Sequence, residues 1–145
     1  MSIKIKERRR ARFHAIQALY QHQLAHNSFD ELKRQFYEDN ANRHPVEWDF
    51  FYRLIDGTAK HLEQIDTHIA TYAANRFDSI NSIDLAILRL GAYELLDCFD
   101  IPYQVIINEY VDQAKTLGTQ EGHRFVNGLL DRLAGVLRNK NEQHS

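Results

Sequence analysis

Apolar residues recur every three or four positions along most of the chain, and this spacing predicts a succession of helices. The first helix is expected over residues 7–25. Its apolar stripe consists of Phe13, Ile16, Leu19, Tyr20 and Leu24. After a short polar break, Ser28 and Glu31 form a capping-box pattern, so a second helix is expected to begin at Phe29.

The middle of the chain predicts one long helix. After a polar loop at 39–45, apolar positions continue at helical spacing from Trp48 onward, with Gly57 as the place where this helix can bend. Pro45 suits an early helical position, because the N–H that proline lacks has no partner there in any case. The polar stretch 75–81 is interpreted as a linker between two halves of the chain.

Residues 83–99 differ from the other helical segments, because their apolar side chains cover most of the helix circumference. Such a pattern is typical of a buried central helix. Pro102 cannot continue it, so a new helix is expected over 103–117, with Gly118 in the position of a C-terminal cap. A last helix is expected over 120–137, followed by a polar, frayed tail.

The composition supports this series of long helices. A chain of 145 residues has the size of one domain, and 6 Gly with 2 Pro are too few for a fold with many tight turns. The single cysteine, Cys98, excludes a disulfide framework and fits a reducing compartment. No apolar run approaches the ~20 residues that span a bilayer. Because no secretory leader is recognisable either, we expect a cytoplasmic protein that does not bind membranes.

The net charge of −2 conceals an asymmetry. Six basic residues and one acid give residues 1–12 a net charge of +5, which leaves −7 on the remaining 133 residues. Such a basic arm on an acidic body points to a polyanion as partner.

Four arginines in five positions dominate the basic arm: Arg8, Arg9, Arg10 and Arg12. Their charges repel one another and oppose the helix dipole, so phosphate, which a guanidinium binds bidentately, is the natural partner. A solvated basic terminus without a ligand is the alternative, and the cluster alone does not separate the two.

Two further residues of the first helix strengthen the hypothesis of a nucleic-acid ligand. Gln17 and Tyr20 fall on the same side as Arg10, at helical steps of three and four. A guanidinium, an amide and an aromatic ring are what single-stranded RNA requires, for phosphates, base edges and base stacking respectively. For Tyr20 taken alone, a place at the rim of the core is the stronger interpretation.

Catalytic or metal-dependent chemistry has weaker support. His22 and His26 are one helical turn apart, but neither an HExxH glutamate nor a third ligand accompanies them. Cys98 lies in the most apolar helix, where an inert buried thiol is expected. Since no acid–base pair or phosphate-binding glycine loop is found, a metal- or thiol-dependent helical enzyme is kept only as the alternative class.

Five groups of residues can be considered together. They are RRRAR running into AIQALY (8–20), AILRLGAYEL (86–95), IPY followed by INEY (101–110), AK (114–115) and FVNGLL (125–130). In this order and spacing, over residues 6–137, the chain resembles the transcription antitermination factor NusB family.

The resemblance implies a single RNA-binding domain over residues 1–145, with an all-α fold of about six to seven helices. Two small helical subdomains would span about 7–75 and about 79–138, with flexible ends at 1–6 and 139–145. The resemblance also implies a protein without catalysis, and the residues lead us to expect no cofactor or metal.

NusB-like proteins bind the boxA element of ribosomal RNA leader transcripts as a heterodimer with NusE, a small-subunit ribosomal protein. They act with other Nus factors on elongating RNA polymerase, and some dimerise when free. Carried over by position, the RNA-contacting residues are Arg8, Arg9, Arg10, Arg12, Gln17, Tyr20, Arg124 and Phe125. Asp84 and neighbouring exposed positions are expected to face NusE.

The chain departs from the family pattern before its last helix. Gly122 stands where Ser is common, which weakens the expected cap of that helix, and Glu121 would repel phosphate beside the proposed RNA surface. The RNA-binding accessory domain of the rRNA methyltransferase type is a second interpretation. We disfavour it because no glycine-rich cofactor-binding half is found in the sequence.

Overall fold

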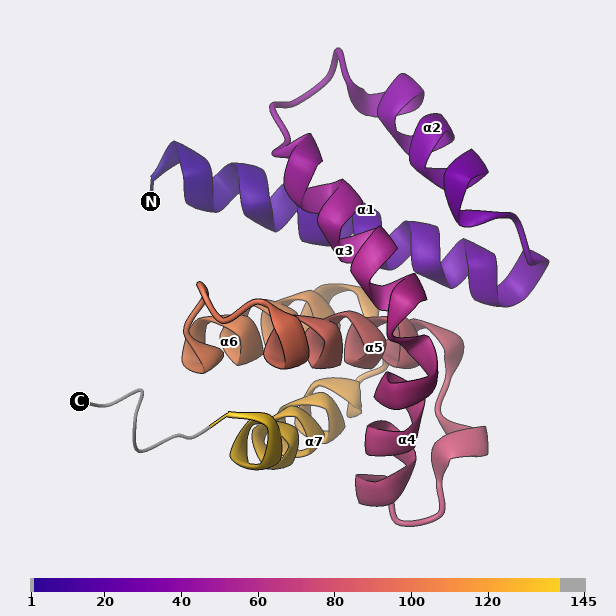
Figure 1. Cartoon of the computed structure of the whole chain (residues 1–145), viewed down its shortest axis with the longest axis vertical. Helices are drawn as coiled ribbons and strands as arrows, with labels where there is room; N and C mark the ends of the chain where they lie inside the picture. Colours follow the sequence, from indigo (N-terminus) through magenta and orange to yellow (C-terminus); the bar gives the residue numbers. More distant parts are fainter. Residues whose placement is uncertain (1, 139–145) are drawn as a thin grey trace.

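Residues 2–138 are described by the computed structural model, and every regular element within them is a helix (Figure 1). The elements are α1 (Ile3–Ala25), α2 (Phe29–Asn40), α3 (Trp48–Lys60), α4 (Leu62–Tyr72), the short 3-10 helix η1 (Phe77–Ser79), α5 (Ser82–Asp97), α6 (Tyr103–Leu117) and α7 (Gly122–Leu137). The prediction of an all-α fold is therefore confirmed.

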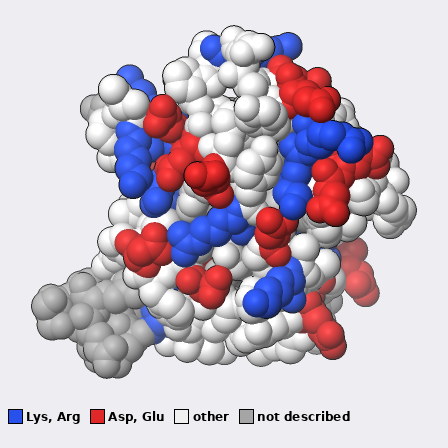
Figure 2. Space-filling model, turned by 45° about the horizontal axis from the view of Figure 1, so that its top comes forward, with Lys and Arg blue, Asp and Glu red and all other residues white. Residues whose placement is uncertain are grey.

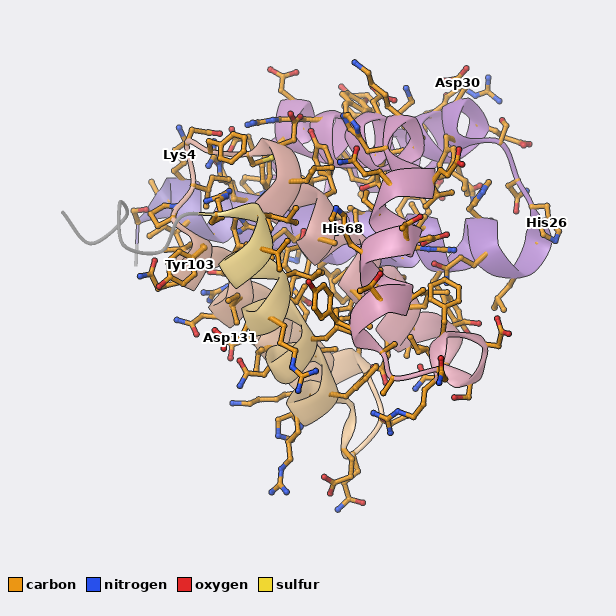
Figure 3. The ribbon with its side chains drawn as sticks, turned by 60° about the horizontal axis from the view of Figure 1, so that its bottom comes forward. Lys4, His26, Asp30, His68, Tyr103 and Asp131 are labelled. Atoms are coloured by element: carbon orange, nitrogen blue, oxygen red, sulfur yellow. The ribbon has the colours of Figure 1, made fainter. Side chains whose placement is uncertain are left out.

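Helix α1 crosses the molecule from one side to the other, and the remaining helices are arranged around it and α5 (Figure 1). Lys4 and His26, near the two ends of α1, lie at opposite sides of Figure 3. Helices α2 and α3 pack against α1, and α5 packs against it as well. Helix α5 in turn contacts α3, α4, α6 and α7.

Helix α5 forms the centre of the core. Its buried apolar residues point in all directions: Ala86, Ile87, Leu88, Leu90, Ala92 and Leu95. This distribution suits a helix that packs against five others, since each contact removes apolar area from water. The predicted buried helix is thus confirmed. Neither α5 nor any other helix of residues 2–138 is long and apolar enough to cross a membrane.

Side-chain caps determine where three of the helices begin. Ser28 Oγ accepts a backbone N–H of the first turn of α2 at 3.1 Å, as its capping pattern predicts. Asn81 caps α5 in the same way at 2.9 Å. Ser2 caps α1, which therefore begins at Ile3 and not near residue 7 as expected.

The single long helix expected from Trp48 is wrong, because two helices occupy this stretch. Helix α3 ends at Lys60 and α4 begins at Leu62, with His61 between them at φ −106° and ψ 16°. Helix α3 packs on α1 and α5, whereas α4 packs on α5 and α7. The chain changes direction between these partners, although its apolar residues keep helical spacing on both sides of His61.

Gly57, the expected bend, lies inside α3 and serves a close approach between helices. A Cβ at this position would lie 2.0 Å from Cζ of Tyr93, which is far below van der Waals contact. The missing side chain thus lets α3 approach the Tyr93 ring of α5, whose hydroxyl donates to Asp97 at 3.0 Å.

Gly57→Ala is expected to lower the free energy of unfolding by about 1–3 kcal/mol, the usual cost of overpacking a core. This sign opposes helix propensity, which favours alanine over glycine by roughly 1 kcal/mol. Urea denaturation measures the difference. The matched control is Gly128→Ala in α7, because nothing lies within 4 Å of a Cβ there, and this variant is expected to gain stability. Equal stabilisation of both variants would contradict the close approach.

Three positions near the helix ends differ from expectation. Pro45 lies in the loop before α3 and not in its first turn, since α3 begins at Trp48. Gly118 is the C-cap of α6, but at φ −86° it does not use the left-handed conformation. The last helix begins at Gly122, two residues later than predicted.

Arg138 corrects the expectation of a frayed tail that begins at this residue. Its side chain is buried, with 4% of the residue exposed. The guanidinium donates four hydrogen bonds of 2.8–3.0 Å to the carbonyl oxygens of Glu94, Leu95, Cys98 and Ile101. The rest of the predicted tail, 139–145, lies outside the described residues.

Candidate nucleic-acid interface

Two arginines near the start of α1 are held by acidic residues of other segments. Arg8 Nε donates to Oε2 of Glu47 at 2.9 Å, and its guanidinium lies over a phenylalanine ring. Arg9 and Glu109 form a bidentate pair with two hydrogen bonds of 2.9 Å, and hydrogen bonding to Glu109 raises the pKa of Arg9. Both arginine side chains remain partly exposed, so they reach the surface in fixed orientations.

Arg12, which was expected to contact RNA, does not lie on this surface, because its side chain is buried. The residue is 3% exposed, and its Nε and Nη2 donate to the two carboxylate oxygens of Glu94 at 2.8 Å. The Tyr110 hydroxyl donates to the same carboxylate. Burial alone would lower the pKa of Arg12, but the charge and hydrogen bonds of Glu94 outweigh burial and raise it. Arg12 therefore ties α1 to α5 in the interior.

Arg10 and Gln17 lie two turns apart on α1 and make fewer hydrogen bonds and ion pairs with the rest of the protein. Arg10 Nη1 donates to the carbonyl oxygen of Pro45 at 2.9 Å in an exposed hydrogen bond. No carboxylate within residues 2–138 forms an ion pair with Arg10, and the half-buried Gln17 side chain makes no hydrogen bond within the same range. Both side chains are thus available to a ligand.

Tyr20 is a surface residue, because 37% of it is exposed. One turn later on α1, Gln23 donates to the carbonyl oxygen of Ser82 at 2.7 Å and accepts from Arg89 at 2.9 Å. Tyr20 therefore lies beside the contact between α1 and the start of α5, with part of its ring open to solvent. Its exposure permits base stacking, which stays a prediction.

Phe125 and Arg124 lie in the first turn of α7. The Phe125 ring is half-buried, and the cation over it is Arg76, whose guanidinium carbon is 4.9 Å from the ring centre. Arg124 has a side chain that is 77% exposed, with an oxygen of Glu121 at 3.6 Å. A hollow of about 300 Å³ beside Phe125 is lined in part by Arg76, Arg124 and Arg132. Arg76 was not predicted from the sequence, because the linker in which it lies has no periodic pattern.

Asp84 is buried, so the expectation of an exposed partner-binding residue is wrong. Only 3% of it is exposed. Its Oδ2 accepts from Asn81 at 2.6 Å and from Thr119 at 3.3 Å, which fastens the loop between α6 and α7. A Cβ on Gly122 would lie 2.6 Å from Oδ2 of Asp84. Glycine at this position, where the family resemblance suggests serine, thus makes room for the buried carboxylate.

Basic and acidic side chains are interleaved on the face shown in Figure 2, where Lys and Arg lie beside Asp and Glu. Ion pairs also offset part of the excess positive charge of residues 1–12. Glu47 and Glu109 offset the charges of Arg8 and Arg9, and the Arg12 charge is offset in the interior. A polyanion that binds α1 has to compete with these carboxylates.

Of the three residues on which the alternative enzyme class depends, His22 is hydrogen-bonded and Cys98 is buried, whereas His26 is exposed. His22 Nδ1 lies 2.7 Å from the carbonyl oxygen of Asn27, and its ring stacks on Phe29. No group of three metal-ligating side chains accompanies His22 and His26 among the described residues. Burial, and then the negative charge of a neighbouring carboxylate, raises the pKa of Cys98 to about 12. The thiol therefore stays protonated near neutral pH.

The fold and this surface define a class: a small all-helical protein that presents arginines, an amide and an aromatic ring along one helix. Residues 9–135 match the sequence model of the NusB family. The transcription antitermination protein NusB of Idiomarina loihiensis is 40% identical over 136 residues, which are 94% of this chain and 97% of that protein. Its counterpart in Pseudomonas syringae pv. tomato is 42% identical over 135 residues, 93% of this chain and 81% of that protein.

Solved structures agree with these matches. T. maritima NusB superimposes with a TM-score of 0.78 and 33% identity, over 88% of this chain and 89% of that chain. A chain of the crystal structure of antitermination factors NusB and NusE in complex with dsRNA gives 0.82 at 24% identity, over 91% and 98%. This second likeness shows the fold alone. The chain belongs to the NusB family, which confirms the resemblance found in its sequence.

Proposed function

We propose that this protein is a non-catalytic RNA-binding factor of transcription antitermination. It binds boxA-type RNA of ribosomal RNA leader transcripts together with NusE, and acts with other Nus factors on elongating RNA polymerase in the cytoplasm. The observation that carries the proposal is membership of the NusB family, because the relatives named as transcription antitermination proteins match nearly the whole chain.

The chemistry of α1 supports RNA as the ligand. Arg8, Arg9 and Arg10 reach the surface near the start of the helix, and Gln17 and Tyr20 follow on the same helix. Phosphate oxygens present the same acceptor geometry as carboxylates, so a phosphate can replace Glu47 or Glu109 on a preoriented guanidinium. Because phosphate has to displace a carboxylate, RNA binds more weakly than it would to unpaired arginines. The same competition favours a polyanion whose charges are closely spaced.

A second contact is proposed at the start of α7, with Arg124 and Phe125 as the residues carried over from the family. Arg76 adds a cation over the Phe125 ring. Residues 13–145 carry a net charge of −7. This charge is complementary to a basic ribosomal protein such as the proposed NusE partner. Asp84 is not assigned to the partner, since it is buried.

Tyr20→Ala is expected to weaken binding of a short boxA-type single-stranded RNA by about 1–3 kcal/mol, the cost of losing one stacked base. The salt dependence of binding should stay unchanged, because no charge is removed. Fluorescence anisotropy of a labelled RNA, at several salt concentrations and with or without a NusE-type partner, measures both quantities.

The matched control is Leu24→Ala, which removes an exposed apolar side chain one turn further along α1 and leaves RNA affinity unchanged. Tyr20→Phe should retain most of the affinity, since the ring is kept. If Tyr20→Ala binds RNA with native affinity, the Tyr20 ring serves only the contact between α1 and α5. An affinity that the NusE-type partner does not enhance would contradict the joint binding.

A further inference from the structure

A hollow of about 470 Å³, here called the loop pocket, lies between α1 and the α2–α3 loop. In Figure 1 this loop descends from the top of the view to the start of α3, above the N-terminal half of α1. Two hydrogen bonds hold it there, from Glu47 N to the Glu7 carbonyl oxygen and from Arg10 to that of Pro45. Its volume lies in the usual range of ligand sites.

The walls of the loop pocket are cationic. Arg10 lines one side from α1, and Arg43 and His44 line the other from the loop. None of the residues that line it carries a carboxylate. Arg43 is exposed and forms no ion pair within the described part of the chain. At the loop pocket, positive charge is therefore not offset by a neighbouring carboxylate.

The loop pocket also contains groups that recognise a base. The Gln17 side-chain amide makes no hydrogen bond within residues 2–138 and can donate and accept. Asn40 Nδ2 donates to the carbonyl oxygen of Phe36 at 2.8 Å, which leaves its Oδ1 as an acceptor. The half-buried Phe13 offers an aromatic ring.

His14 also lines the loop pocket, and aromatic neighbours pack against its ring. Its ring stacks on Trp48 at a centroid distance of 5.7 Å and an interplanar angle of 11°, and it meets Phe36 edge-on. Burial, and then the charge of Arg43, lowers the pKa of His14, so the ring is neutral near pH 7. A lining that combines aromatic rings with two arginines suits a planar base attached to a phosphate.

We propose that the loop pocket binds one nucleotide of a single-stranded RNA, with its phosphate between Arg10 and Arg43 and its base beside Phe13 and Gln17. This inference rests on the proposed function and extends the RNA surface from α1 to the α2–α3 loop. An acidic peptide would satisfy the cations but leave the ring and the amides without a role, so RNA is favoured.

The test uses the full-length protein with Arg43 and His44 both replaced by alanine, and a fluorescently labelled boxA-type single-stranded RNA. Affinity is expected to fall roughly tenfold, as for loss of a charge-assisted phosphate contact together with a ring. The slope of log affinity against log salt should become shallower by about 0.7, the value for one phosphate of a single strand. Arg34→Ala is the matched control, because it removes the same charge from an exposed position of α2 outside the loop pocket.

The outcomes separate this inference from the proposed function. The double variant could keep the native RNA affinity and salt dependence while Tyr20→Ala still binds RNA more weakly. This result would overturn the role of the loop pocket but not RNA binding itself. No RNA binding by the native protein would overturn both.

Ring NMR signals of the histidines report on occupancy directly. RNA should shift those of His14 and His44, whereas His68 on α4 should not respond. Equal shifts with polyglutamate would show a site for any polyanion and overturn the nucleotide assignment.

Discussion

Glu94→Ala is expected to lower the free energy of unfolding by about 3–5 kcal/mol, which is the cost of leaving a buried charge without its partner. Glu94 is completely buried and accepts two hydrogen bonds from Arg12 and one from Tyr110. Without this carboxylate the Arg12 guanidinium stays charged in the interior, because arginine does not release its proton in proteins. Urea denaturation followed by circular dichroism measures the loss.

Two controls isolate the buried charge. Lys33→Ala removes the cation of an exposed pair with Asp56, and it should change stability by about 0–1 kcal/mol. The double variant with methionine at positions 12 and 94 should recover most of the stability lost in Glu94→Ala, since an apolar pair leaves no charge behind. A Glu94→Ala variant as stable as Lys33→Ala would show that water or a rearranged side chain stabilises Arg12.

The Arg12 ion pair also changes how arginine variants of α1 have to be compared. Arg12→Ala would reduce RNA binding through loss of folded protein, whereas Arg8→Ala and Arg10→Ala alter the surface. Affinities therefore have to be measured on the folded fraction. A lower affinity of correctly folded Arg12→Ala would return this residue to the RNA surface.

Local signals along the chain were sufficient to predict most of the helices. The cap at Ser28 and the proline before α6 involve neighbours within a few residues, so both are visible in the sequence. The break at His61 is not visible, because it arises from α3 and α4 packing on different helices. The bend was predicted at Gly57 because glycine is common at helix bends. The structure shows instead that glycine is needed there to make room for the ring of Tyr93, 36 residues further along.

The candidate site shows the same limit more strongly. Clustered arginines are evident in the sequence, but their acidic partners are 39, 82 and 100 residues away, at Glu47, Glu94 and Glu109. Only the fold reveals that Arg8 and Arg9 form ion pairs with carboxylates and that Arg12 is buried. Arg43 and His44 were missed because a polar loop carries no periodic signal.

Arg138→Met is expected to lower the free energy of unfolding by about 3 kcal/mol, because buried acceptors lose hydrogen bonds from a charged donor. Methionine keeps the length of the apolar stem, so the loss reports on the guanidinium and not on packing. That group connects four carbonyl oxygens at the corner between α5 and α6. The planar guanidinium has several N–H donors in a fixed arrangement that can reach all four oxygens. Arg138→Lys offers a single ammonium group, so it should be more stable than Arg138→Met but less stable than the native protein.

The corner that Arg138 holds determines where α6 lies, and α6 carries Glu109, the partner of Arg9 on the proposed RNA surface. Hydrogen exchange should therefore show lower protection at the start of α6 in Arg138→Met, while α2 keeps its native protection. The control is Arg132→Met on the exposed face of α7, where a change within about 0.5 kcal/mol is expected. If both variants are equally stable, the four hydrogen bonds of Arg138 contribute no net stability and the corner is held by apolar packing alone.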